Sequence, residues 1–516
     1  MIKNPVLTGF NPDPSIVYVD GVFYIATSTF EYFPGVKIAS STDLANWETV
    51  GYPLDEPRLL HMEGNPKSSG VWAPCLSYCD GLFYLVYTDM KYWTNPYKDS
   101  PNYITTAKDI RGPWSDPVFI NCSGFDPSLF HDDDGRKYFV SMEWDYRKTG
   151  DAQFSGILLT ELDPVSLKPV GEPVKIFEGS LRGLVEAPHI YKKDGYYYLF
   201  TAEGGTQYEH AETVARSRDL YGEYEMHPQV HLICTEDAHD SPIRKTGHGS
   251  IAQSKDGRWW FAFLCGRPLD ETMRCPLGRE TSINELVWED DWPYLKNKTM
   301  VPDECFEGYG KQEPLQKIRY DFTSPRFLLD FQSLRSRPEF SVEEDGALRI
   351  RGGNSPYCNF GHSSLLRRQT DFNFTASTSF KLHGKNFQQM AGLMYRYDEE
   401  THYFLRVFHD AENGKSTVGL LCADRGEFSI PVETEIPLHA GVMHMKLIVK
   451  GRRGIFSYSL NGTSYIDIPH EIDVSTLSDD YARPLGFTGA YAGMCCLDMR
   501  DKTAWADFYH FEYTPD

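Results

Sequence analysis

The sequence has no apolar run of about 18 residues, the length that a membrane-spanning helix needs. It also lacks a basic surplus, because 51 lysines and arginines stand against 73 aspartates and glutamates, a formal net charge of −22. Nucleic acids and anionic membranes select basic surfaces, so neither is expected as a partner. A neutral small molecule or a polysaccharide fits this composition better.

Cysteine motifs are missing as well. The 11 cysteines are an odd number, and no two of them have the CxxC spacing that zinc and redox sites use. Scattered unpaired thiols are typical of a reducing compartment. No apolar stretch near the N-terminus has the pattern of a secretory signal. We therefore expect a cytoplasmic protein, unless the chain is a trimmed form of a secreted one.

What the sequence does contain is an internal repeat. An Asp-Gly pair recurs with a period of 54 to 62 residues, beginning at Asp20, Asp80, Asp134, Asp194 and Asp256. Asp-Gly favours a tight hairpin turn, and a strand-like run rich in aromatic residues follows each pair. Five strand-rich units predict an all-β fold, with a five-bladed β-propeller over residues 1–310. The less favoured alternative is a meander or sandwich in which the turns coincide by chance.

Seven or eight residues before these turns stand side chains suited to chemistry: Asp13, Trp72, Asp126, Glu186 and His248. The inner strands of a propeller line one axis, so these five positions should converge. Three carboxylates held close together repel one another, and acid–base catalysis is the functional reason to tolerate this. Turn capping by each Asp-Pro and a metal cluster are the alternatives, although the spacing demands no metal.

Short segments around these positions carry a resemblance to a known family. They are Asn11–Ser15, Trp72–Pro74, Phe125–Ser128, Glu186–His189, Thr201–Thr206, Gly247–Ser250 and Leu277–Thr281. In this order they resemble glycoside hydrolase family 43, most closely its β-xylosidases with a C-terminal β-sandwich. Residues 489–493 and 506–508 resemble the accessory domain of the same family.

The resemblance implies an inverting hydrolysis carried by three catalytic carboxylates. Asp13 would be the general base that activates water, and Glu186 the general acid that protonates the departing glycosidic oxygen. Asp126 would orient Glu186 and raise its pKa by repulsion between like charges. Inverting enzymes hold acid and base roughly 6.5–9.5 Å apart, a gap that opposed blades can provide.

The resemblance also suggests which residues bind the sugar. Trp72, Phe30 and Phe125 would offer it apolar faces, with ordinary core packing as the alternative. Arg279 would donate hydrogen bonds to sugar hydroxyls, with an ion pair to Glu280 or another acid as the alternative. Thr206 would border the pocket.

His248 would lie on the axis beneath the sugar. The resemblance allows it to help hold a calcium ion or a water cluster, and a buried structural histidine is equally compatible with the sequence. We expect that no cofactor is required, with calcium at the axis as the one possible ion.

The period vanishes near Gln312. We predict a linker at 311–319 and a second domain at 320–516, where alternating polar and apolar residues indicate half-buried antiparallel strands. This pattern favours a jelly-roll-like, or concanavalin-like, β-sandwich. Such a module could bind carbohydrate. The resemblance instead implies that it lends a loop to the active-site rim, with Tyr491 as the candidate side chain, which would favour exo attack.

Taken together, the residues and the resemblance predict an exo-acting glycosidase that removes xylose from the non-reducing ends of β-1,4-xylo-oligosaccharides. An α-L-arabinofuranosidase, or an enzyme with both activities, is the alternative. A non-catalytic carbohydrate-binding propeller has no use for three carboxylates, and a sialidase-like propeller would need an arginine cluster at its site. The resemblance also implies a homo-oligomer, either a dimer or a tetramer.

Overall fold

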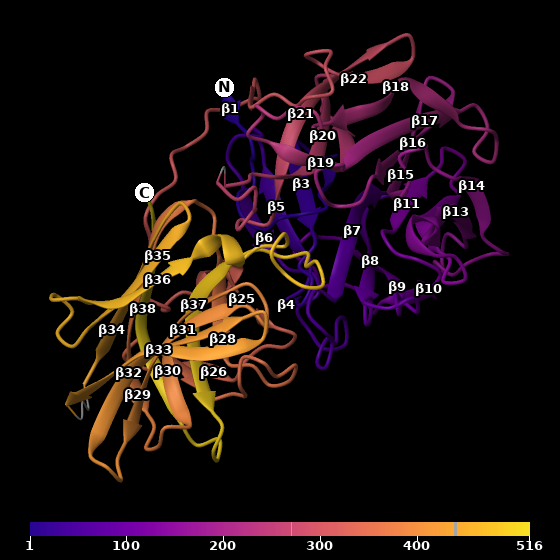
Figure 1. The fold of residues 1–516 in the computed structure, drawn as a ribbon. Helices are drawn as coiled ribbons and strands as arrows, with labels where there is room; N and C mark the ends of the chain where they lie inside the picture. The colour runs from indigo at the N-terminus through magenta and orange to yellow at the C-terminus, as the bar shows by residue number, and fades with distance from the viewer. Residues whose placement is uncertain (270, 438–440) are drawn as a thin grey trace.

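The computed structural model describes residues 1–269, 271–437 and 441–516. These residues form two β-sheet domains, a propeller and a sandwich, which Figure 1 shows side by side. Within the described part of the chain the helices are three short 3-10 turns: η1 (Gly150–Gln153), η2 (Pro325–Leu329) and η3 (Val474–Thr476). We find no helix in this part with the length and apolar character to cross a membrane.

The first domain confirms the predicted propeller, because five four-stranded antiparallel sheets follow one another along the chain. Blade 1 contains β2 (Ser15–Val19), β3 (Val22–Thr27), β5 (Lys37–Ser41) and β6 (Glu48–Gly51). Blade 2 contains β7 (Gly70–Cys79), β8 (Leu82–Met90), β9 (Asn102–Ala107) and β10 (Val118–Asn121). Blade 3 contains β11 (Ser128–His131), β12 (Lys137–Trp144), β13 (Phe154–Leu162) and β14 (Val174–Phe177).

The last two blades have the same strand order. Blade 4 contains β15 (Glu186–Lys193), β16 (Tyr196–Glu203), β17 (Ala211–Ser217) and β18 (Glu225–Cys234). Blade 5 contains β19 (Arg244–Gln253), β20 (Trp259–Gly266), β21 (Arg279–Glu289) and β22 (Trp292–Leu295). A separate two-stranded sheet joins the start of the chain to the end of the propeller through β1 (Ile2–Lys3) and β23 (Cys305–Phe306).

The Asp-Gly pairs all lie between the first and second strands of a blade, but they form two kinds of turn. In blades 1, 2 and 4 both residues have positive φ, such as 50° at Asp20 and 88° at Gly21. This is the conformation of a two-residue type I′ hairpin. In blades 3 and 5 the pair belongs to a five-residue loop, which in blade 3 is closed by a hydrogen bond from the N–H of Asp132 to the carbonyl of Arg136.

The second domain confirms the predicted sandwich of two sheets. One sheet has the order β26 (Phe340–Val342), β27 (Leu348–Arg351), β38 (Trp505–Pro515), β29 (Asn373–His383), β34 (Met443–Lys450), β35 (Arg453–Ser459) and β36 (Ile466–Asp473), with β24 (Ile318–Tyr320) also paired to β38. The other has the order β33 (Glu427–Pro437), β32 (Lys415–Asp424), β31 (His402–Asp410), β30 (Gln389–Arg396), β37 (Tyr491–Asp498), β28 (Ser364–Arg368), β25 (Phe331–Leu334) and β4 (Tyr32–Phe33). The sandwich begins at Ile318, two residues inside the segment predicted to be linker.

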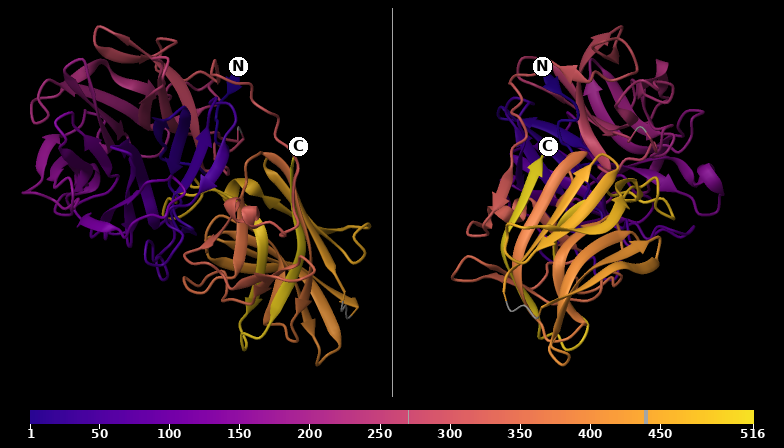
Figure 2. Two further views of the ribbon diagram at one scale, coloured as in Figure 1. Left: turned by 180° about the vertical axis from the view of Figure 1, so that it is seen from behind. Right: turned by 60° about the vertical axis from the view of Figure 1, so that its left-hand side comes forward.

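The two domains share a sheet, because β4 comes from blade 1 and is the edge strand of the sandwich. Its residues Tyr32 and Phe33 pair with Leu334 and Ser333 of β25. A buried apolar cluster continues across this junction, from Phe30 and other propeller side chains to the sandwich. The sandwich therefore packs on the propeller as part of one continuous core, and the two views in Figure 2 show the domains in direct contact.

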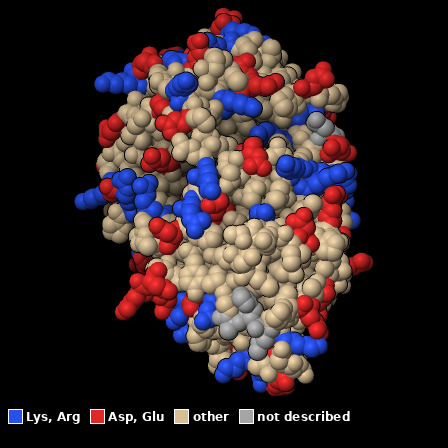
Figure 3. Space-filling model, turned by 90° about the vertical axis from the view of Figure 1, so that its left-hand side faces the viewer, with Lys and Arg blue, Asp and Glu red and all other residues tan. Residues whose placement is uncertain are grey.

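The surface displays charges of both signs. Figure 3 shows acidic and basic side chains interspersed over the face that it presents, with an uncharged area over the lower half. The acidic surplus of the sequence is therefore not gathered into one patch on this face.

Candidate active site

A backbone kink recurs at the equivalent repeat position in all five blades, either just before the inner strand or within its first half. One residue there has a positive φ, a conformation that costs free energy for any residue other than glycine. In blades 1, 3 and 5 this residue is itself a predicted site residue, and in blades 2 and 4 it follows one directly. The five residues are Asp13 (56°), Ala73 (41°), Asp126 (55°), Ala187 (51°) and His248 (47°).

The kink brings side chains from different blades into contact around Asp13, which is 4% exposed. The Ser28 hydroxyl donates to its Oδ2 at 2.5 Å, and Arg279 Nη1 donates to its Oδ1 at 3.0 Å. His248 Nδ1 lies 3.6 Å from the same Oδ1. Two donors from two blades therefore fix both oxygens of this carboxylate.

Glu186 and Asp126 are two further carboxyl groups, and their environment differs from that of Asp13. Burial raises the pKa of Glu186 to about 8, the charge of Asp13 raises it further, and Arg279 opposes the rise. Burial also raises the pKa of Asp126 well above its usual range, and repulsion by Glu186 and Asp13 adds to this. At neutral pH the pair therefore retains a proton.

One detail of this pair differs from the expectation. We expected repulsion by Asp126 to raise the pKa of Glu186. Burial is the largest cause in the structure, with Asp13 second, and the repulsion between the two groups raises the pKa of Asp126 instead. The low polarity around Glu186 could not be read from the repeat alone.

Arg279, the first residue of β21, connects the carboxylates to the aromatic residues. Besides its bond to Asp13, its Nη2 donates to the carbonyl of Phe487 at 3.1 Å. Its guanidinium lies 5.3 Å from the centre of the Phe30 ring. The alternative for Arg279 was an ion pair to Glu280 or another acid: Glu280 is paired with Arg267, whereas Arg279 does form an ion pair with another acid, Asp13.

The aromatic side chains gather around Trp72. Its indole N–H donates to the carbonyl of Ser68 at 2.8 Å, which fixes the orientation of the ring. These rings pack on one another, as the core-packing alternative expects, and Phe30 also lies beside the Arg279 guanidinium, while their role in sugar binding stays a prediction. The ring centres nearest to Trp72 belong to Phe487 (5.3 Å), Phe125 (5.4 Å), Phe30 (5.7 Å) and Trp93 (6.2 Å).

Comparison with known proteins identifies this arrangement. The family model for glycosyl hydrolases family 43 matches residues 2–293, and the model for the β-xylosidase C-terminal concanavalin A-like domain matches residues 319–514. The chain belongs to glycoside hydrolase family 43. It is therefore a glycosidase, and the fold, the carboxylates and the accessory domain have one common explanation.

Close relatives cover the whole chain. A xylosidase/arabinosidase 43B of Humicola insolens is 43% identical over 100% of this chain and 98% of its own length. A β-xylosidase of Bacillus subtilis is 40% identical over 99% of each chain. Among solved structures, a xylan β-1,4-xylosidase from Bacillus halodurans has 42% identity, covers 100% of both chains and superposes with a TM-score of 0.95.

The sandwich of this family 43 enzyme does lend a loop to the site, but through a residue other than the predicted one. Tyr491 has no exposed surface and stacks on Tyr32 with ring centres 3.9 Å apart. Phe487 is the side chain that contacts Trp72 and Phe30. The assignment of the rim residue is corrected from Tyr491 to Phe487, because Tyr491 already belongs to β37 and points into the domain junction.

The loop at residues 478–490 carries Phe487, and Figure 1 shows it as a yellow segment that extends from the sandwich to the propeller. The N–H of Phe487 donates to Ser68 Oγ at 3.1 Å. Gly278, with φ of 73°, meets this loop so closely that a Cβ would lie 2.9 Å from Gly489 Cα. The sequence held a signal for Phe487, an aromatic residue between Gly486 and Thr488, just before the segment that carried the resemblance.

Two polar atoms of residues predicted to bind the sugar have no partner among the described residues. Thr206 Oγ1 and Arg279 Nε are buried and make no hydrogen bond within the described residues. Buried polar atoms are nearly always paired in folded proteins, so unpaired ones indicate a missing partner. Both atoms belong to residues predicted to bind the sugar, and a sugar hydroxyl is a suitable partner for each.

His248 lies beside Asp13 as a neutral imidazole, because burial lowers its pKa to about 4. Calcium prefers six to eight oxygen ligands, and the carboxylate beside the His248 imidazole is that of Asp13. Within the described ranges we find no group of three or more histidine, cysteine, aspartate or glutamate side chains placed to hold a metal ion. The residues present therefore do not fit a calcium site with protein ligands.

Proposed function

We propose that this family 43 glycosidase releases xylose from the non-reducing ends of β-1,4-xylo-oligosaccharides with inversion at the anomeric carbon. The observation that carries this proposal is the contrast between the environments of two carboxyl groups. Asp13 is fixed by Ser28 and Arg279, whereas Glu186 keeps a proton at neutral pH. A base and an acid set apart by their environments are what glycoside hydrolysis requires.

In the proposed reaction, Asp13 accepts a proton from a water molecule as that water attacks the anomeric carbon. The bond from this carbon to the glycosidic oxygen breaks, and Glu186 donates its proton to the departing oxygen. Asp126 holds Glu186 in place and shares its proton, while Arg279 binds sugar hydroxyls and keeps Asp13 aligned. One water is consumed, and the new bond lies on the opposite face of the sugar.

The choice of xylose and of exo attack is supported by two observations. The relatives are named as xylosidases, and one is named as an arabinosidase as well. The Phe487 loop covers one side of the carboxylates, so a long chain has no room to continue past them on that side. The second candidate is an α-L-arabinofuranosidase, alone or as an additional activity.

Side-by-side kinetics on xylobiose and on a synthetic α-L-arabinofuranoside test the substrate assignment. We expect the larger kcat/KM on xylobiose. A kcat/KM on the arabinofuranoside that exceeds the value on xylobiose would make the second candidate the main activity.

We propose further that no cofactor is required, since the described carboxyl groups suffice for acid and base roles. Enzyme dialysed against EDTA should keep its activity. A loss of activity that added calcium restores would contradict this.

We also propose a cytoplasmic location, which agrees with the 11 cysteines, all of them within the described residues and all unpaired. Detection in a secreted fraction would contradict that location.

We propose that the protein forms a homo-oligomer through the outer face of the sandwich. Apolar side chains exposed by 44–57% line a cavity of about 500 Å³ on the sheet that contains β30 to β33. They include Phe387, Phe428, Ile430 and Met499. Phe428→Asp should lower the mass measured by light scattering from an oligomer to a monomer, and a monomeric wild-type protein would contradict the proposal.

A further inference from the structure

The loops that follow the second strand of each blade lie on the same face as the carboxylates. This follows from antiparallel pairing: β7 begins where β8 ends, with Gly70 opposite Met90. In blade 3 the N–H of Met142, near the end of β12, donates to the carbonyl of Phe125 at 3.2 Å, next to Asp126. The loops at 91–101 and 145–153 are therefore part of the rim of the active site.

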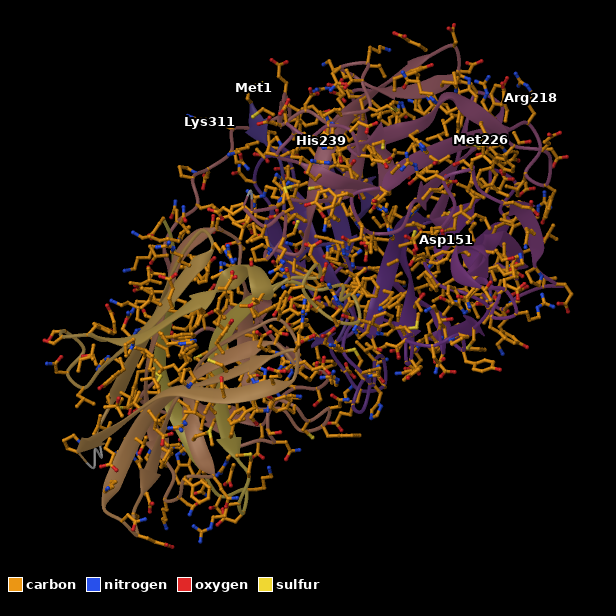
Figure 4. All side chains as sticks on the ribbon, viewed as in Figure 1. Met1, Asp151, Arg218, Met226, His239 and Lys311 are labelled. Carbon is orange, nitrogen blue, oxygen red and sulfur yellow. The ribbon has the colours of Figure 1, made fainter. Side chains whose placement is uncertain are left out.

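The sandwich closes part of this rim, and its Phe487 ring lies 4.9 Å from Trp93 at the inner end of the 91–101 loop. Its loop at 478–490 contacts blade 5 through a hydrogen bond from the N–H of Cys275 to Asp480 Oδ2 at 2.9 Å. It contacts the segment before blade 2 through Phe487 and Ser68. Blade 3 lies away from this loop, and Figure 4 places Asp151, at the tip of the 145–153 loop, far from the sandwich. The side of the site at blade 3, together with the outer end of the 91–101 loop, is therefore where a bound chain can leave.

Aromatic rings lead outward along this open side. Trp72 contacts Phe125, and Phe125 lies 6.2 Å from Trp144 at the end of β12. Trp144 Nε1 donates to the carbonyl of Pro96 at 2.8 Å, which ties the two rim loops together. Lys98 Nζ lies over the Trp144 ring, 4.2 Å from its centre. The path from the carboxylates to the outer rim is thus continuous and held in place.

Two exposed tyrosines stand at the end of this path. Tyr97, from the blade 2 loop, and Tyr146, from the blade 3 loop, have ring centres 5.2 Å apart. Their exposed fractions are 68% and 53%. Single exposed aromatic residues need no explanation, but an aromatic pair continuous with an active site indicates a binding surface.

We propose that Tyr97 and Tyr146, the outer aromatic pair, bind a xylose residue on the leaving-group side, beyond the sugar that is bonded to the cleaved one. The pair would pack against the apolar face of that residue, and the phenol hydroxyls can bond its hydroxyl groups. This inference rests on the proposed function. It makes xylotriose, which can reach the outer aromatic pair, a better substrate than xylobiose, which cannot.

The test compares kcat/KM on xylobiose and xylotriose for the wild type and for the double variant Tyr97→Ala/Tyr146→Ala. We expect the double variant to lose about 3- to 10-fold on xylotriose, the range of one aromatic contact, and less than about twofold on xylobiose. Tyr97→Phe/Tyr146→Phe keeps both rings and should retain most of the xylotriose activity. Tyr221→Ala removes a tyrosine of similar exposure at the other end of the strands and should change neither value.

The other outcomes overturn the inference in distinguishable ways. An equal loss of kcat/KM on both substrates would mean that the outer aromatic pair stabilises the catalytic site and does not bind a further sugar. An unchanged kcat/KM on both would mean that the pair binds no sugar. A change in mass by light scattering, without an effect that depends on substrate length, would make the pair a contact between two copies. If the wild type hydrolyses neither oligosaccharide, the proposed substrate class fails and this subsite fails with it.

Discussion

Asp13 and Glu186 show how one functional group acquires two roles from its surroundings. Asp13 faces Arg279 and Ser28, which supply a positive charge and a hydroxyl donor. Burial raises the pKa of Glu186 to about 8, and the charge of Asp13 adds to this rise. The same arginine that binds Asp13 only partly offsets this rise. Burial and the charge of Asp13, rather than the arginine, therefore keep the proton on Glu186.

The first prediction concerns Glu186. Glu186→Gln keeps the shape of the side chain but removes the transferable proton, so kcat on xylobiose should fall about 10²- to 10⁴-fold. Glu203→Gln is the matched control, because Glu203 is a buried glutamate in the same blade that accepts hydrogen bonds from Ser180. Steady-state kinetics with an unactivated substrate provide the measurement. Turnover of Glu186→Gln near the wild-type value would show that another group is the acid.

The raised pKa also predicts a pH dependence. Activity should decline as pH rises through about 8, because the proton that Glu186 donates is then lost.

The stability of the fold should depend on pH for the same reason. The unfolded state releases the Glu186 proton near pH 4.5, whereas the folded state keeps it to about pH 8. The stability that Glu186 contributes is thus present at low pH and lost as pH rises to 8. Glu186→Gln should raise Tm relative to wild type at pH 8 and have little effect at pH 4, as measured by calorimetry.

At the scale of elements, the blade repeat explains why most of the site could be predicted. Any feature that recurs with the strands, such as Asp13, Asp126 and His248, is found by aligning the five units. Trp72 and Glu186 were found in the same way, although the kinked residue follows them by one position. The number of blades and their order along the chain were predicted for the same reason.

Features outside the repeat could not be predicted in this way. Phe487 belongs to a sandwich loop that has no counterpart in the blades, so the alignment of units gave no position for it. The strand β4 is another case, because two propeller residues pair with β25 of the other domain across about 300 residues of sequence. Contacts of this length depend on how the domains pack, which no local pattern encodes.

A prediction at the scale of elements concerns the sandwich loop at residues 478–490. Phe487→Ala removes the ring that contacts Trp72 and Phe30, so kcat/KM on xylobiose should fall about 3- to 10-fold or more. Tyr491→Phe is the control, because the Tyr491 hydroxyl is buried and unpaired among the described residues, and its removal should leave kcat/KM unchanged. A loss at Tyr491 without a loss at Phe487 would restore the original assignment.

For the whole molecule, the sandwich and the propeller behave as one folding unit rather than as two linked modules. Arg368 Nε of the sandwich donates to the carbonyl of Phe10 at 2.7 Å, and the N–H of Arg335 donates to the carbonyl of Glu31 at 2.8 Å. Both bonds are buried beside the apolar cluster that crosses the junction. Removal of the sandwich would expose that cluster and leave β4 without its partner strand.

A chain that ends at residue 310 should therefore be unstable and inactive. We expect it to aggregate or to bind a hydrophobic dye, while full-length Phe487→Ala remains folded with a normal circular dichroism spectrum. This comparison separates loss of the loop from loss of the fold. An isolated propeller that is monomeric, cooperative in unfolding and fully active on xylobiose would show that the sandwich has no part in the site.

The central claim is that Asp13 and Glu186 act as base and acid of an inverting xylosidase. The most direct test is to follow xylobiose hydrolysis by proton NMR during the first turnovers and to record the anomer of the xylose released from the non-reducing end. The account predicts α-xylose first, with β-xylose appearing only as the free sugar equilibrates. Initial release of β-xylose would mean retention through a covalent intermediate and would contradict the assigned roles.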